Sequence, residues 1–124
     1  MRQLIVLQEG AIVVPSLDLN STETGAVADF LGIVREMEGP VRLSGLRYEA
    51  YEPMARKQLE RIFKELGVLY PAFAVTFIHR IGWVPVGGVS LFMRVQTIHR
   101  GDAFEFMAAA INRLKRDVPV WKRA

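Results

Sequence analysis

The clearest pattern along the chain is an apolar stripe at helical spacing that begins just after Pro53. Its positions are Met54, Ala55, Gln58, Leu59, Ile62, Phe63 and Leu66. Side chains at this spacing share one face of an α-helix, so the segment predicts a helix with one buried face. Pro53 suits the first turn of that helix, and Gly67 is a plausible residue for its end.

A second helix is predicted from about residue 103 to residue 117. Asp102 is its candidate N-cap, and Glu105, three residues on, completes a capping-box pattern. Its apolar stripe comprises Phe104, Ala108, Ile111 and, at the end, Lys115. Lys115 is therefore expected to continue a stripe that faces the core.

The remaining apolar segments have β character. Strands are predicted within residues 2–14, 25–35, 41–51, 73–81 and 89–98. Gly10 divides the first segment into one or two strands, and Gly32 indicates a bulge or a close backbone approach. Residues 16–23 are predicted as a loop or short helical turn, and residues 82–88 as a turn. Because strands outnumber the two principal helices without alternating with them, the fold class is α+β, a single domain over residues 1–124.

Composition narrows the function classes. With 124 residues, 51% of them hydrophobic, the chain can bury a core without disulfides or metal. It has no run of 18 apolar residues and no pattern typical of a signal peptide. The absence of cysteine excludes thiolate nucleophiles and cysteine-bound metal, and its two histidines, His79 and His99, form no local metal motif. We expect a cytoplasmic protein without a metal or cofactor.

Positive charge is concentrated in the last twelve residues, 113–124. They hold five basic residues and one acid, and the rest of the chain holds eleven basic and twelve acidic residues. The net charge of +3 therefore comes from this segment. Lys115 and Lys122 lie within it, seven residues apart around Pro119. This concentration predicts a site for an anionic small molecule or an anionic chain end.

Lys115 has two interpretations. Partial desolvation at the end of a buried stripe favours a neutral, nucleophilic amine. Alternatively, its stem covers the edge of the core while its ammonium group reaches water. Arg35 closes one predicted strand, and His99 and Arg100 precede the second helix, where free N–H groups favour anions. Ordinary surface placement of these basic residues is the alternative. The pair His79–Arg80 is interpreted as structural.

Five motifs together resemble the catalytic (large) subunit of molybdopterin synthase. In chain order they are G-x-V-R at 32–35, Y-E-A-Y at 48–51, H-R-x-G at 79–82, H-R-x-x-A-F at 99–104 and L-K-x-x-x-P-x-W-K at 114–122. The resemblance covers roughly residues 24–124. It implies an α/β-hammerhead fold and a homodimer that forms a heterotetramer with two small ubiquitin-like carrier subunits.

The implied activity is a sulfurtransferase reaction of molybdenum cofactor biosynthesis. Sulfur passes from a thiocarboxylate at the carrier's C-terminal glycine to cyclic pyranopterin monophosphate, giving the dithiolene of molybdopterin. Carried over by motif, Lys115 and Lys122 are the catalytic, substrate-contacting lysines. The implied substrate-binding residues also include Arg35, His99, Arg100 and Arg123. Both reactants are anions, which agrees with the basic segment.

The chain departs from the family pattern at three points. Ile33 stands where the family often has a basic residue, Ala124 stands where it often has an acid, and the C-terminal tail is shorter. A basic module that binds nucleic acid or acidic partners is the alternative function, because clustered Lys and Arg neutralise phosphates. A family member that has lost catalysis is a third, against which the presence of both lysines argues.

Overall fold

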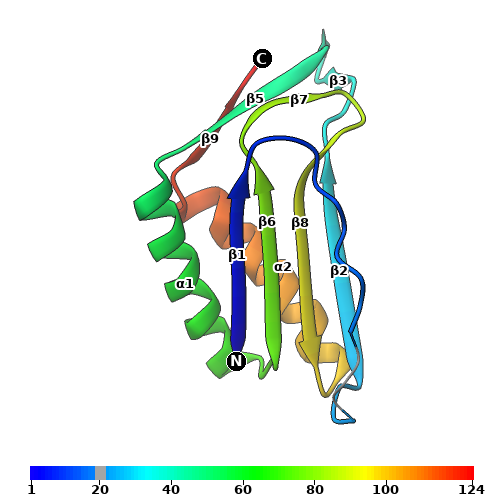
Figure 1. The fold of residues 1–124 in the computed structure, drawn as a ribbon, viewed down its shortest axis with the longest axis vertical. Coiled ribbons are helices and arrows are strands. Elements are labelled where there is room, and N and C mark those ends of the chain that lie inside the picture. The colour runs from blue at the N-terminus through cyan, green and yellow to red at the C-terminus, as the bar shows by residue number, and fades with distance from the viewer. Residues whose placement is uncertain (19–21) are drawn as a thin grey trace.

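A four-stranded sheet forms the centre of the computed structural model, which describes residues 1–18 and 22–124 (Figure 1). Its strands, in spatial order, are β1 (Arg2–Gln8), β6 (Ala74–Arg80), β8 (Val89–Thr97) and β2 (Ala26–Ile33). β1 runs parallel to β6, and the other neighbours are antiparallel. The alternation of side chains along each strand gives the sheet two distinct faces.

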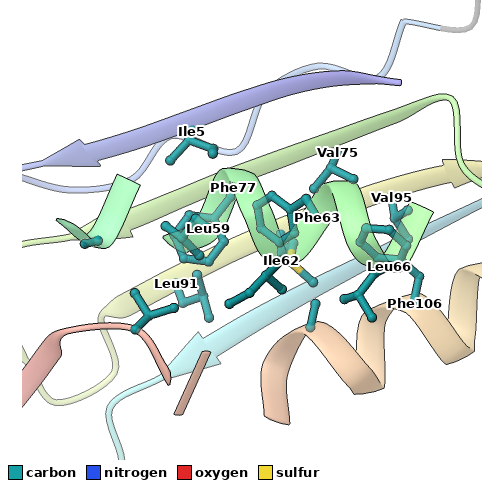
Figure 2. Close-up of a cluster of buried hydrophobic side chains, with 14 of the residues drawn as sticks. Ile5, Leu59, Ile62, Phe63, Leu66, Val75, Phe77, Leu91, Val95 and Phe106 are labelled. Carbon is teal, nitrogen blue, oxygen red and sulfur yellow. The ribbon is translucent and has the colours of Figure 1, made fainter. Parts of the chain in front are cut away.

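One face of this sheet is covered by α1 (Glu52–Leu69) and α2 (Arg100–Asp117). Between the sheet and the helices lies the main core, whose buried side chains include Phe77 and Val95 of the sheet, Phe63 of α1 and Phe106 of α2 (Figure 2). The Phe63 ring lies 5.8 Å from that of Phe77 and 6.2 Å from that of Phe106, centre to centre. These aromatic contacts join α1 to the sheet and to α2.

The segment after β1 crosses the opposite face of the sheet. Arg94 of β8 fixes it there, because its guanidinium donates hydrogen bonds to the carbonyl oxygen of Pro15 at 3.0 Å and to both carboxylate oxygens of Asp29 at 2.7 and 2.9 Å. Arg94 is 7% exposed, so the pair with Asp29 compensates a nearly buried charge.

A smaller antiparallel sheet lies across one end of the large sheet (Figure 1). Its strands, in spatial order, are β7 (Gly82–Pro85), β5 (Gly45–Ala50) and β9 (Val120–Arg123). A short hairpin of β3 (Met37–Glu38) and β4 (Val41–Arg42) precedes it. Val34, Leu46 and Val84 form a second, small core beneath this sheet.

The structure confirms the α+β class, both helices and the strands predicted within 2–14, 25–35, 73–81 and 89–98. A register irregularity between Gly32 and Ile33 is the expected bulge. Only one strand, β1, forms within residues 2–14. Residues 16–18 of the predicted loop have no helix or strand, and residues 19–21 of that prediction lie outside the described part of the chain.

Several predicted boundaries were wrong. The segment 41–51 is not one strand, because it contains β4 and β5, and the predicted turn 82–88 contains β7. Gly67 lies inside α1, whose C-cap is Tyr70. α2 begins at Arg100 with His99 as its N-cap and no side-chain capping bond, so the capping box predicted at Asp102 does not form.

The predicted core stripe of α2 was also out of phase. Phe104 is 65% exposed, and Ala108 and Lys115 are exposed too. The buried face consists of Ala103, Phe106 and Ala110. The predicted stripe and the observed buried face both have helical spacing. Hydrophobicity alone therefore does not reveal which of the two faces the sheet, where small alanines allow close packing. Neither helix in the described residues is long and apolar enough to cross a membrane.

Candidate functional site

A cavity of about 480 Å³ lies where the two sheets meet the C-terminal half of α2. Its wall is assembled from β2, β3, β5, β6, β8, α2 and β9. Apolar side chains such as Phe30, Leu91 and Ile111 form much of this wall. The cavity has the size and mixed lining of a small-molecule site.

Three cationic side chains line the cavity: Arg35, which follows β2, Lys115 in the last turn of α2, and Lys122 in β9. The bulge at Gly32/Ile33 precedes Arg35, and β9 pairs Lys122 with Tyr48 of β5. Strand pairing thus brings together residues 35 and 122, which are distant in the sequence. Among the described residues, no carboxylate forms an ion pair with Arg35 or Lys115, so both charges are available to an anion.

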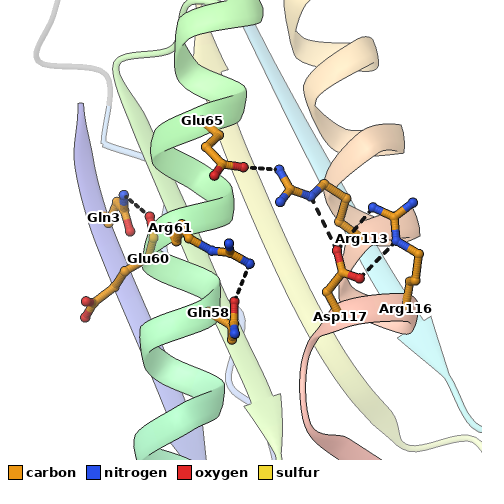
Figure 3. A network of polar contacts seen from close by, with 8 residues as sticks. All are labelled: Gln3, Gln58, Glu60, Arg61, Glu65, Arg113, Arg116 and Asp117. Atoms are coloured by element: carbon orange, nitrogen blue, oxygen red, sulfur yellow. Dashed lines mark hydrogen bonds and ion pairs between the residues drawn. The ribbon is translucent and has the colours of Figure 1, made fainter.

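The arginines on either side of Lys115 are engaged elsewhere (Figure 3). Arg113 forms an ion pair with Glu65 of α1 at 2.6 Å, and Arg116 with Asp117 at 2.9 Å. The hydrogen bond from Arg116 lowers the pKa of Asp117. Both arginines are thus paired with carboxylates, and Lys115 is the basic residue of that turn that lines the cavity.

His79 also lines the cavity, although it is only 5% exposed. Its Nδ1 lies 2.9 Å from the carbonyl oxygen of Arg80, and its ring meets that of Tyr48 edge to face at 5.0 Å. A carbonyl can only accept a hydrogen bond, so the proton belongs on Nδ1. Desolvation lowers the pKa of His79, outweighing this hydrogen bond, which raises it. His79 is therefore a neutral group beside three cations.

Glu38 of β3 supplies the one carboxylate found in the lining of this cavity over the described residues. Its Oε1 lies 3.3 Å from Nζ of Lys122. Two residues after Lys122 the sequence has Ala124, not an acid. The carboxylate that contacts Lys122 belongs instead to Glu38 of β3.

The other basic residues predicted for the site lie outside this cavity. His99 and Arg100 are at the N-terminal end of α2, whereas Lys115 is near its C-terminal end. Fifteen residues at about 1.5 Å each separate Arg100 from Lys115 by roughly 22 Å along the helix. Arg123 forms an ion pair with Glu49 of the neighbouring strand β5. One chain thus brings together Arg35, Lys115 and Lys122 only.

Glu38, Tyr48 and His79 were not predicted as parts of the site. Tyr48 and His79 belong to motifs that the sequence displays, but only the pairing of β5 with β9 and the place of β6 in the sheet bring them to the cavity. Glu38 lies in a turn-like segment among scattered acids, and nothing in its sequence surroundings distinguishes it from Glu36.

The fold and the cavity define a class of protein. It is an α+β protein with a cavity whose cationic side chains come from a strand end, a helix end and a short C-terminal strand. The chain belongs to the MoaE protein family, whose family model matches residues 7–117. It is 40% identical over 99 residues to the molybdopterin synthase catalytic subunit of Staphylococcus carnosus, covering 80% of this chain and 66% of that one. With the Halalkalibacterium halodurans protein of the same description it is 38% identical, covering 99% and 76%.

Solved structures agree with the fold. Molybdopterin synthase from Staphylococcus aureus superposes with a TM-score of 0.83 at 32% identity, covering 95% of this chain and 88% of that chain. The MoaE protein from Burkholderia ambifaria gives a TM-score of 0.81 at 28% identity, covering 100% and 83%. A Helicobacter pylori complex of subunits 1 and 2 of molybdopterin-converting factor contains the same fold, with a TM-score of 0.72 at 22% identity over 97% and 82%.

Proposed function

We propose that this chain is the catalytic subunit of a molybdopterin synthase. It acts as a sulfurtransferase that converts cyclic pyranopterin monophosphate into the dithiolene of molybdopterin. The observation that carries the proposal is the convergence of Arg35, Lys115 and Lys122 on one cavity in a chain of the MoaE family. The alternative of a nucleic-acid binding module has no such support, because these cations line a concave site rather than an extended surface.

The chemistry of the cavity suits this reaction. A phosphate and a thiocarboxylate are both anions, and preorganised cations stabilise such groups where water is partly excluded. Lys115 and Lys122 are the proposed catalytic lysines, with Lys115 the candidate for direct attack or proton transfer. Arg35 is the proposed contact for the anionic groups. The apolar wall formed by residues such as Leu91 and Ile111 suits the flat pterin ring.

The proposed partner is a small ubiquitin-like carrier that delivers sulfur as a C-terminal thiocarboxylate. A supplied thiocarboxylate explains how a chain without cysteine transfers sulfur. The Helicobacter pylori structure with the same fold is a complex of two subunits, and this supports the proposed partnership. We expect the carrier's tail to enter the cavity in extended form, held by main-chain hydrogen bonds. The protein is proposed to act in the cytoplasm, as one domain.

A homodimer is the proposed functional unit, with two carriers completing a heterotetramer. His99 and Arg100 lie too far from Lys115 along α2 to bind the same small substrate within one chain. If they contribute to substrate binding, they do so in the site of the partner protomer. A two-fold axis would then create two equivalent composite sites. Arg123, which pairs with Glu49, is proposed as a contact at the rim of the site.

Substitution of Lys115 tests the proposed activity. Lys115→Ala is expected to abolish dithiolene formation from a thiocarboxylated carrier and the pterin substrate, with folding unchanged because the side chain is exposed. Lys115→Arg is expected to fail as well, since a guanidinium stays protonated and is neither nucleophile nor base. Lys64→Ala, on the exposed face of α1, is the matched control that should keep full activity. Near-normal turnover by Lys115→Arg would show that only the positive charge of Lys115 is needed for the reaction.

A further inference from the structure

The cavity contains a charge that opposes its proposed use. Three cations line it, but so does the carboxylate of Glu38, 3.3 Å from the ammonium group of Lys122. An anion that approaches Lys122 therefore meets a negative charge already in contact with that lysine. The two anions repel each other, and the repulsion is stronger beside apolar walls than in open water.

Glu38 lies on an element that can move without disturbing the core. It is the last residue of β3, and Gly39 follows with a φ of +58°, in the hairpin turn before β4. Every residue of this hairpin from 37 to 42 is exposed. The side chains of Glu38 and Lys122 are 45% and 53% exposed, so water can replace either partner in the ion pair.

The neighbouring ion pair of the hairpin differs in its place. Glu36 pairs with Arg42 across the base of the hairpin, where Leu43 N–H also donates to the carbonyl oxygen of Glu36 at 2.7 Å. Neither Glu36 nor Arg42 lines the cavity. The hairpin thus carries one carboxylate at its base, away from the cavity, and one at its tip side, in contact with a proposed catalytic lysine.

We propose that Glu38 is a built-in competitor for the anion that binds at Lys122. Its carboxylate occupies Lys122 in the free protein and is displaced by an anionic group of the incoming reactant. Breaking the ion pair costs free energy, so Glu38 weakens by a common factor the binding of every anion that contacts Lys122. The identity of that anion rests on the proposed function, whereas the competition by Glu38 does not. The anion is either a phosphate group or the carboxyl end of a chain.

Direct binding measurements separate the two sources. Inorganic phosphate and acetyl-Gly-Gly, a carboxylate that ends like a carrier tail, are titrated into the wild-type protein, Glu38→Gln and the matched control Glu36→Gln. Glu38→Gln is expected to bind the anion that uses Lys122 about two- to fivefold more tightly, the range typical of one exposed ion pair. Glu36→Gln is expected to bind both anions as the wild type does. The probe that gains affinity identifies the source.

A second measurement tests the contact without any anion. Acetylation of Lys122, followed by mass spectrometry in anion-free buffer, is expected to be faster in Glu38→Gln than in the wild type or Glu36→Gln. The rate at Lys57, exposed on α1, provides an internal reference. Unchanged labelling of Lys122, or unchanged or weaker binding of both anions by Glu38→Gln, would overturn the inference. Weaker binding would mean that Glu38 only positions Lys122.

The failure of the proposed function gives a different result. Suppose that Glu38→Gln binds anions more tightly and labels faster at Lys122 while neither the wild type nor any variant forms dithiolene. That result would support the competition by Glu38 and contradict the proposed reaction. If Glu38→Gln and Glu36→Gln form dithiolene and bind anions as the wild type does, the result would support the proposed reaction and contradict the role of Glu38.

Discussion

At the scale of single residues, His79 is a buried group whose protonation is expected to affect stability. It is buried between Tyr48 and Phe77 and faces a cavity lined by Arg35, Lys115 and Lys122, with Glu38 the carboxylate on the same wall. Desolvation lowers its pKa below the model-peptide value of 6.5. The unfolded chain, which has the higher pKa, therefore binds a proton that the folded protein resists.

This difference predicts a stability loss on mild acidification. As the pH falls below 6.5, the free energy of unfolding should decrease by up to about 1.4 kcal/mol per pH unit, the limit for one proton. Urea unfolding at a series of pH values measures the slope. His79→Gln should flatten it, while His99→Gln, at an exposed position, should retain it. An equal slope in His79→Gln and the wild type would show that His79 is not the responsible group.

At the scale of elements, β5 is the strand on which the site depends, because it holds β7 on one side and β9 on the other. Gly45 begins this strand and is buried. A Cβ atom at this position would lie 2.5 Å from the Trp83 ring and 2.5 Å from the carbonyl oxygen of Val84. The close approach of β7 to β5 therefore requires glycine here.

Gly45→Ala is accordingly expected to destabilise the protein by about 1–3 kcal/mol, as overpacking does, and to displace β7. Gly101→Ala is the matched control, since a Cβ there meets no atom within 4 Å and alanine favours helix. Thermal unfolding compares the two. If Gly45→Ala melted like the wild type, the contact between β5 and β7 would be adaptable rather than fixed.

The same elements show where sequence reasoning succeeds and where it stops. α1 has a long, strongly periodic apolar face, and β6 and β8 are rich in β-branched and aromatic residues, so their local patterns predict them. β7 and β9 have four residues each, contain proline or basic side chains, and exist because β5 lies between them. No local pattern encodes that pairing, which depends on tertiary contacts.

The candidate site divides in the same way. Arg35, Lys115 and Lys122 were predicted from motifs, and the structure brings them to one cavity. Glu38 and His79 were not, because their roles arise from the position of a hairpin and of a central strand. The prediction that Lys115 continues the core-facing stripe of α2 was wrong for a different reason. Two overlapping stripes in α2 have helical spacing, and in the structure Ala103, Phe106 and Ala110 are the buried ones.

At the scale of the whole molecule, α2 separates two groups of basic residues. Lys115 lines the cavity near one end, and His99 and Arg100 lie at the other. Mixing two inactive variants, Arg100→Ala and Lys115→Ala, under subunit exchange tests whether these groups meet across a dimer. Each heterodimer should recover one intact site and up to about half of the wild-type activity.

A matched mixture gives the control for this experiment. Lys115→Ala with Lys122→Ala should recover nothing, because both residues line the same cavity in one chain and no heterodimer contains an intact pair. An absence of recovery with Arg100→Ala, in heterodimers verified by mass, would place the whole site within one protomer. His99 and Arg100 would then have no part in substrate binding.

The position of β9 in the fold also has a consequence for biosynthesis. This strand emerges from the ribosome after every other element described here, yet it pairs with β5, about 75 residues earlier, and carries Lys122 into the cavity. The large sheet and both helices can be complete while the cavity still lacks one wall. During synthesis, the wall that carries Lys122 is therefore added to a large sheet whose strands have all been made already.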